Sequence, residues 1–240
     1  MTRIAIIAAM PGELMPFVRG WHHETRNRVD VWTRKHEHSE WIAACAGAGQ
    51  DAARRALAAA EQDGRADQIV SVGWVGALAA DCHPASVHRV SRIVDARTGE
   101  QYAAEAPGCD CILVTAPRVV DEAEKRRLAH AYSAIIVDME AAALARLAEA
   151  RGIPFICIKG VSDELTARLP DLNRFLAADG RFQLPKFILF AALRPWYWPA
   201  LLRMGENSRK AALGIAKSLH ELLDARSHPR KRNGYPNLKP

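Results

Sequence analysis

Two carboxylates, Glu140 and Asp163, lie in short polar segments that follow apolar runs. A carboxyl group that keeps its proton can donate it to a departing group, and an ionised one can accept hydrogen bonds from hydroxyls or orient water. Taken singly, each has a simpler interpretation, as a charge or a cap at a helix N-terminus. Both together, about two dozen residues apart, indicate acid–base chemistry.

The elements around these carboxylates form a strand–helix–strand unit. The β-branched run Ile135 to Val137 predicts a strand, and Ala141 to Ala150 consists almost wholly of strong helix formers. Gly152 can close that helix, and Phe155 to Ile158 is apolar enough for a strand that is buried on both faces. Ligands of open parallel sheets bind outside the carboxyl ends of the strands, where both carboxylates are expected.

A third carboxylate, Glu13, follows a predicted buried strand, Arg3 to Ala9, and lies in the first turn of a short helix. An acidic residue there also complements the helix dipole, so Glu13 gains a chemical role only through the other motifs. Val29 to Trp32 and Trp41 to Cys45 are predicted to be neighbouring strands.

Two glycine-rich segments follow predicted strands. Residues 46–50 lead into a predicted helix at Asp51 to Gln62, and residues 73–78 are predicted to turn after the strand Gln68 to Val72. Such segments let backbone amides approach an anion or a hydroxyl. Neither one carries the full dinucleotide fingerprint or the lysine of a P-loop.

The rest of the chain continues the alternation of strands and helices. Strands are predicted at Val87–Asp95 and Ile112–Thr115 with a loop at 97–110 between them, and helices at Asp121–Tyr132, about 171–178 and Ser208–Ala225, the last with Ser208 as its N-cap. With 240 residues and 49% hydrophobic side chains, the chain is expected to form one α/β domain at 1–226.

These motifs resemble the purine nucleoside phosphorylase and nucleosidase superfamily. The segments VDMEAAA at 137–143 and VSD at 161–163 look most like methylthioadenosine/S-adenosylhomocysteine nucleosidase. The VDME spelling is also similar to hopanoid-associated phosphorylases and futalosine hydrolases. The resemblance covers roughly residues 3 to 165, and it implies a three-layer α/β/α fold with a central mixed, mostly parallel twisted sheet, and a homodimer.

The resemblance implies cleavage of the N-glycosidic bond of a purine nucleoside, with adenine as the base and a 5′ substituent on the ribose. Asp163, presented by Ser162, would protonate the base at N7. Glu140 and the Met139 backbone would bind the ribose hydroxyls, and Glu13 would orient water on the opposite face.

Three further residues are implied by the same resemblance. Gly76 and Trp74 lie in a segment similar to the family's G-x-A-G-G-L turn, and Val119 lies where relatives place an apolar residue against the base. Trp74 departs from the small or hydroxyl residue usual there, which favours hydrolysis. Phosphate stays open as a co-substrate, and phosphorolysis of a lipid-linked adenosine in hopanoid biosynthesis is the alternative. No other cofactor is expected.

The net charge of +6 is unevenly distributed. Residues 181–240 hold 12 Lys and Arg against 3 Asp and Glu, a balance of +9, so residues 1–180 hold 21 against 24, a balance of −3. No nucleic-acid-binding motif accompanies this charge, so nucleic acid is not an expected partner. The apolar run at 4–9 is too short for a signal sequence, which favours a cytoplasmic protein. The five cysteines and nine histidines show no metal-ligand spacing, so no metal is expected.

Beyond residue 165 the sequence departs from the short nucleosidases, and residues 181–205 are expected to be an apolar and basic insertion. Its run Phe187 to Leu193, with Trp196 and Trp198, is too short to span a bilayer but has the composition of an interfacial segment. Residues 185–203 are therefore expected to contact a membrane or a bulky 5′ substituent, and the alternative is an internal lid or a dimer contact. The basic tail at 227–240 is expected to be disordered. Two further hypotheses compete with an enzymatic function: a non-catalytic purine-binding module and a peripheral membrane protein.

Overall fold

The computed structural model describes residues 1–36 and 38–227, and it contains a mixed sheet of 11 strands. The strands are β1 Thr2–Ala8, β2 His22–Arg26, β3 Val29–His36, β4 Ser39–Cys45, β5 Gln68–Ala77, β6 Val87–Arg89, β7 Arg92–Asp95, β8 Gln101–Ala103, β9 Ile112–Thr115, β10 Ile136–Asp138 and β11 Phe155–Asp163. The helices are α1 Pro11–Val18, α2 Gln50–Ala60, α3 Glu122–Tyr132, α4 Ala141–Arg151, α5 Leu184–Ala192 and α6 Trp198–Ser227, with 3₁₀ turns η1 Leu172–Phe175 and η2 Pro195–Tyr197.

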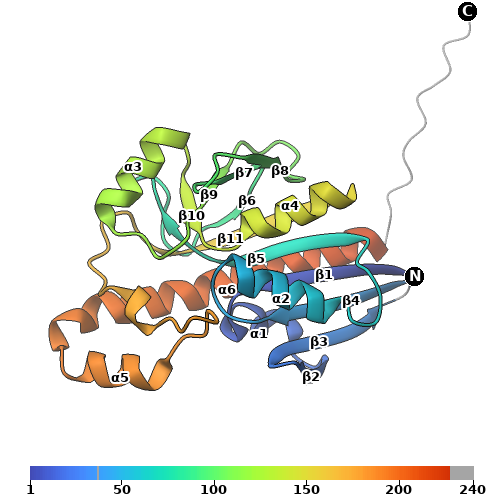
Figure 1. The fold of residues 1–240 in the computed structure, drawn as a ribbon, viewed down its shortest axis with the longest axis horizontal. Helices are drawn as coiled ribbons and strands as arrows, with labels where there is room; N and C mark the ends of the chain where they lie inside the picture. The colour runs from blue at the N-terminus through green and yellow to red at the C-terminus, as the bar shows by residue number, and fades with distance from the viewer. Residues whose placement is uncertain (37, 228–240) are drawn as a thin grey trace, which may run out of the picture.

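Helices cover both faces of the sheet, as Figure 1 shows. Helices α1 and α6 pack on one face, where Ile4 and Ile6 of β1 join their core, and α2 and α4 pack on the other face with Ala5 and Ile7. Because both faces of β1 are buried, its apolar residues run without polar interruption. This is the predicted α/β/α fold.

Strand β5 is the centre of the sheet. It runs parallel to β1 and to β11, and at Gly76 it pairs with β11 on one edge and with β10, antiparallel, on the other. The acid-bearing strands β10 and β11 therefore flank β5, and they are not neighbours as a simple strand–helix–strand unit would make them. Their carboxyl ends nevertheless converge on the same region of β5.

The prediction of a turn at 73–78 is wrong, because β5 continues through Ala77. The strand predicted at Phe155–Ile158 likewise continues, as β11, to Asp163. Glycine in a strand marks a place where another group approaches the backbone. A Cβ at Gly73 would lie 2.9 Å from the Glu13 carboxylate, and one at Gly76 would lie 3.1 Å from Asp163 Oδ2. The glycines accommodate side chains of the site.

Other predicted boundaries also need correction. The single strand expected at 87–95 is two strands, β6 and β7, and the loop expected at 97–110 contains β8. The edge strand β2 was not predicted because its polar sequence has no apolar alternation. The helix expected at 171–178 is the 3₁₀ turn η1. The tail predicted from residue 227 lies, apart from its first residue, outside the described residues.

Helix α6 begins ten residues earlier than predicted, at Trp198, so Ser208 lies in its interior and is not an N-cap. Gly205 is tolerated inside this helix because a glycine within a helix costs only about 1 kcal/mol. The helix packs closely on β11, where a Cβ added to Gly160 would lie 2.7 Å from Ala211 Cβ.

We expect Gly160→Ala to lower the free energy of unfolding by about 1–3 kcal/mol, because α6 must move to make room for the methyl group. The control is Gly205→Ala on α6, where nothing lies within 4 Å of the added carbon. That variant should be neutral or more stable by up to about 1 kcal/mol, because alanine favours helix. Urea unfolding measures both. Equal stability of Gly160→Ala and the wild type would show that the contact between α6 and β11 is loose.

Candidate functional site

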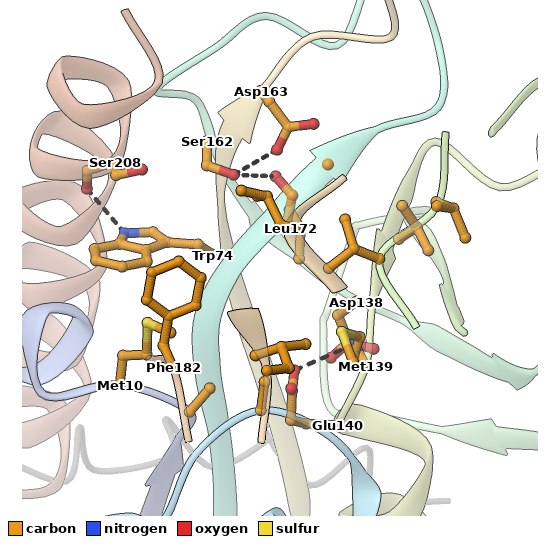
Figure 2. A pocket seen from close by; sticks show the side chains of 18 of the residues that line it. Met10, Trp74, Asp138, Met139, Glu140, Ser162, Asp163, Leu172, Phe182 and Ser208 are labelled. Atoms are coloured by element: carbon orange, nitrogen blue, oxygen red, sulfur yellow. Dashed lines mark hydrogen bonds between the residues drawn. The ribbon is translucent and has the colours of Figure 1, made fainter. Parts of the chain in front are cut away.

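A cavity of about 300 Å³ opens where β5, β10 and β11 end. All eight residues singled out from the sequence line it, namely Glu13, Trp74, Gly76, Val119, Met139, Glu140, Ser162 and Asp163. Figure 2 shows most of them around the opening, with Asp163 and Ser162 at one end and Glu140 with Met139 at the other. Residues far apart in the sequence thus share one cavity, and their individual roles stay predictions.

Asp163 lies at one end of the cavity in a hydrogen-bonded cluster. Its Oδ2 accepts a hydrogen bond from Lys125 Nζ at 2.5 Å, and its Oδ1 lies 2.7 Å from the Ser162 hydroxyl. A register shift in β11 between Val161 and Asp163 places Asp163 opposite Gly76, and such irregularities often occur beside functional sites. No helix follows Asp163, so the alternative interpretation of this residue as a helix cap is wrong.

Lys125 also lines the cavity, and it was not predicted from the sequence. It comes from α3, is 5% exposed, and also donates a hydrogen bond to the Glu164 carbonyl at 2.9 Å. A buried ammonium group requires an anion, and here that anion is Asp163. Lys125 sits in a charge-rich helix sequence, EAEKRR, and nothing in that pattern distinguishes it from its exposed neighbours.

Glu140 lies at the other end of the cavity, at the N-terminus of α4. Its Oε1 accepts a hydrogen bond from the Gly49 amide at 2.7 Å, and its Oε2 accepts one from the Met139 amide at 3.2 Å. Burial raises the pKa of Glu140 to about 7; the nearby Asp138 adds to this increase, and Lys159 opposes it. The glycine-rich segment before α2 therefore supplies an amide to a carboxylate of this protein.

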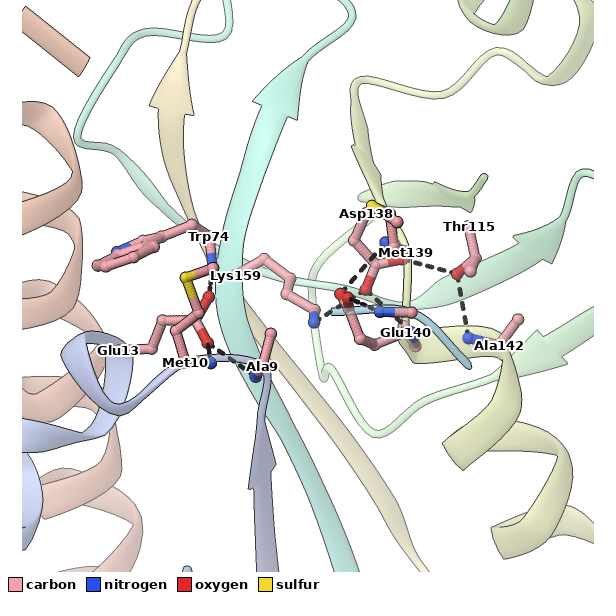
Figure 3. A network of polar contacts seen from close by, with 12 residues as sticks. Ala9, Met10, Glu13, Trp74, Thr115, Asp138, Met139, Glu140, Ala142 and Lys159 are labelled. Carbon is pink, nitrogen blue, oxygen red and sulfur yellow. Dashed lines mark hydrogen bonds and ion pairs between the residues drawn. The ribbon is translucent and has the colours of Figure 1, made fainter. Parts of the chain in front are cut away.

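Behind Glu140 lies a buried ion pair between β11 and β10 (Figure 3). Lys159 Nζ lies 2.9 Å from Asp138 Oδ2, and both side chains are almost completely buried. Asp138 also accepts hydrogen bonds from the Thr115 hydroxyl at 2.7 Å and from the Ala141 amide at 2.9 Å. Burial lowers the pKa of Lys159, but Asp138 and other nearby anions raise it above its ordinary value, so the lysine stays charged. A charged residue in the apolar run FICIK was the available sequence signal, because such a residue must find a partner.

Glu13 is 3% exposed and is held by backbone amides. Its Oε2 accepts hydrogen bonds from the Ala9 and Met10 amides, both at 2.8 Å, and its Oε1 accepts one from the Trp74 amide at 2.8 Å. Burial raises the pKa of Glu13, while these amides and Lys159 oppose the increase. The carboxyl caps the start of α1, as the simpler interpretation required, and also reaches the cavity wall.

Trp74 forms part of the apolar wall. Its Nε1 donates a hydrogen bond to the Ser208 carbonyl of α6 at 2.9 Å (Figure 2). A Cβ on Gly12 would lie 2.9 Å from the indole, so the ring fits against the first turn of α1. The ring thus lies between α1 and α6 and presents an apolar surface to the cavity.

The C-terminal part of the chain closes the remaining side of the cavity. Apart from Ser208, its lining residues are apolar: Leu172, Leu176, Phe182, Phe187 and Met204. Asn173 ties this segment to the Val119 loop, because its Oδ1 accepts from the Val119 amide and its Nδ2 donates to the Val119 carbonyl, each at 2.9 Å. None of these contacts was evident from the sequence. Among the described residues, no group of three or more His, Cys, Asp and Glu side chains could hold a metal ion.

Solved structures with a similar fold include nucleosidases and a futalosine hydrolase. A Helicobacter pylori MTAN mutant with 5′-methylthioadenosine in its active site has a TM-score of 0.71, at 14% identity, with 93% of this chain and 99% of that chain covered. A futalosine hydrolase mutant of Helicobacter pylori has a TM-score of 0.72 at 14% identity, with 93% and 99% covered. The 5′-methylthioadenosine nucleosidase of Arabidopsis thaliana has a TM-score of 0.72 at 16% identity, with 93% and 95% covered.

At these identities the structural likeness shows the fold. No curated protein matches the sequence. A family model described as the phosphorylase superfamily matches residues 3–110 and 98–181, which together cover well over half of the chain. The chain therefore belongs to the phosphorylase superfamily, an enzyme family that includes nucleosidases and nucleoside phosphorylases.

Proposed function

We propose that this protein hydrolyses the N-glycosidic bond of a purine nucleoside, with adenine as the base and a substituent on the ribose 5′ carbon. The observation that carries the proposal is the arrangement of three carboxylates, Asp163, Glu140 and Glu13, on the walls of one cavity in the superfamily's fold. The similar structures described as nucleosidases and as futalosine hydrolase support the choice of hydrolysis.

Departure of the base demands a proton donor. As the bond between N9 and C1′ breaks, negative charge develops on the purine, and a proton at N7 neutralises it. In our proposal Asp163 takes up a proton from water and passes it to N7. The Lys125 ammonium, 2.5 Å from Oδ2, stabilises the Asp163 carboxylate before and after this transfer, and the Ser162 hydroxyl fixes the other oxygen. Lys125 thus acts through Asp163, as a positioning residue.

The ribose and the water are placed by the other two carboxylates. Glu140 accepts hydrogen bonds from the ribose hydroxyls when it is ionised, and its contact with the Gly49 amide fixes its orientation. Glu13 orients water at the opposite face of the sugar. Positive charge develops on the ribose in the transition state, and carboxylates on its two sides stabilise that charge.

The apolar walls of the cavity indicate which 5′ substituent and which nucleophile the site favours. Trp74 and the residues Leu172, Leu176, Phe182 and Phe187 are apolar side chains, and an apolar substituent that displaces water from them gains about 25 cal/mol per Å². Trp74 also offers no small hydroxyl for a phosphate ion. We therefore favour water as the nucleophile and an apolar 5′ group; a lipid-linked adenosine is the extreme case.

Asp163→Asn is expected to lower turnover by roughly 10²- to 10⁴-fold, because the amide cannot supply the proton. Adenine release from 5′-methylthioadenosine measures the effect. Asp224→Asn is the matched control, because Asp224 is an exposed residue near the far end of α6, and it should keep wild-type activity. A folded Asp163→Asn protein with wild-type adenine release would contradict the assignment.

The activity should depend on the ionisation of Glu140. Because its pKa is raised to about 7, Glu140 is protonated below that pH and accepts from ribose hydroxyls only as it ionises. We expect kcat/KM to rise about tenfold per pH unit below pH 7 and to level off above it. Glu140→Gln should lose most turnover together with this rise. A flat wild-type profile between about pH 5.5 and pH 8 would remove Glu140 from this role.

The sugar product separates hydrolysis from phosphorolysis. In phosphate buffer we expect the free ribose derivative, because the proposed nucleophile is water, and chromatography of the products decides the matter. Ribose 1-phosphate derivatives as the main product would instead make the protein a phosphorylase.

The same assay run on adenosine, inosine, 5′-methylthioadenosine and a lipid-linked adenosine tests the 5′ group. An apolar substituent should raise kcat/KM over that of adenosine. Equal values for all three adenine nucleosides would contradict an apolar 5′ pocket, while leaving the reaction itself established.

A further inference from the structure

Residues 184–202, called here the C-terminal hairpin, comprise α5, η2 and the start of α6, and they project from the rest of the fold (Figure 1). No residue of α5 or η2 is buried. Seven of the ten exposed large hydrophobic side chains of the described residues lie here: Leu184, Ile188, Leu189, Leu193, Trp196, Trp198 and Leu202. An apolar patch concentrated in this way marks an interaction surface.

The hairpin is apolar on two sides for two different reasons. Phe187 lines the cavity, and Phe187 and Phe190 pack edge-on against Phe175 at 5.3 and 5.1 Å. Ile188 and Leu189, on the other side of the helix, are 57% and 64% exposed. The inner side, with Phe187 and Phe190, packs against the cavity wall. The outer side, with Ile188 and Leu189, packs against none of the described residues.

The charge around this patch is of one sign. Residues 181–205 contain Arg181, Lys186, Arg194 and Arg203 and no Asp or Glu. Arg181 pairs with Asp179, whereas no acidic side chain of the described residues pairs with the other three. The guanidinium of Arg194 lies 4.1 Å from the centre of the Phe190 ring, so this charge is held on the hairpin.

These charges favour a lipid surface over a second copy of the chain. In a two-fold symmetric dimer the same patch faces itself, so these cations would meet cations without a neutralising anion. Anionic headgroups supply the missing charge, and each Lys or Arg near such a surface contributes about 1 kcal/mol. Tryptophan beside arginine and lysine is also typical of the membrane interface.

We propose that the C-terminal hairpin docks on the surface of an anionic lipid bilayer, with Ile188, Leu189 and Trp196 in the headgroup region and Lys186, Arg194 and Arg203 among the lipid phosphates. The helices of the described residues include none with both the length and the apolar content that a transmembrane span requires. The nine residues of α5 suit a segment that lies in the interface. Since Phe187 lines the cavity from the same helix, docking brings the cavity next to the bilayer. The docking itself does not depend on the reaction proposed above.

Co-sedimentation of the full chain with vesicles tests this docking. We expect binding to phosphatidylcholine vesicles that contain about 30% phosphatidylserine, and binding roughly 100-fold weaker to pure phosphatidylcholine, because three cations lose their partners. Leu189→Glu should weaken binding by at least about tenfold. Leu213→Glu is the matched control, because Leu213 is 51% exposed on α6 outside the hairpin, and it should bind as the wild type does.

Circular dichroism establishes that each variant is folded, and Lys186→Glu provides a second variant that alters only an exposed charge. It should weaken binding to the anionic vesicles and leave binding to neutral ones unchanged. The proposal is overturned if the full chain ignores both vesicles, or if Leu189→Glu and Leu213→Glu bind equally. If the chain does not bind vesicles and light scattering shows that Leu189→Glu converts a dimer to a monomer, the patch is instead a contact between two copies of the chain, and the proposal is overturned.

Discussion

The buried ion pair between Lys159 and Asp138 constrains much of the rest of the site. A charge on the inside of a sheet is tolerated only when an opposite charge and further hydrogen bonds compensate its desolvation. Asp138 fulfils this requirement because the Thr115 hydroxyl and the Ala141 amide also donate to it. Strands β9, β10 and β11 and the start of α4 are thereby held in one arrangement.

That arrangement determines the electrostatics of the cavity. Glu140 follows Asp138 by two residues and experiences both the repulsion of this carboxylate and the attraction of Lys159. Burial and the Asp138 carboxylate together raise the pKa of Glu140 to about 7, and the Lys159 charge limits this increase. The opposite end of the cavity has a separate ion pair, Lys125 with Asp163.

Close backbone approach is the second constraint. Gly73 and Gly76 leave room for Glu13 and for the Lys125–Asp163 pair against β5, and any larger residue there would displace a charged group. Helix α6 completes the enclosure from outside the sheet, because Gly160 lets it pack on β11 and the Ser208 carbonyl holds the Trp74 indole. The wall formed by the C-terminal segment thus depends on small residues in the central strands.

The elements whose signals are local could be predicted from the sequence. The apolar run of β1, the alanines of α4 with Gly152 in the left-handed conformation at its end, and the bounds of β9 follow from neighbouring residues. The motif residues also came from the sequence, because Asp163 and Glu140 belong to short, specific patterns. The partners of these residues depend on the folded chain, because Lys125 is 38 residues from Asp163 and Gly49 is 91 residues from Glu140. Which strands adjoin, how far β5 continues and where α6 begins depend on packing between distant segments, and local propensity carries no information about a contact that only the folded chain creates.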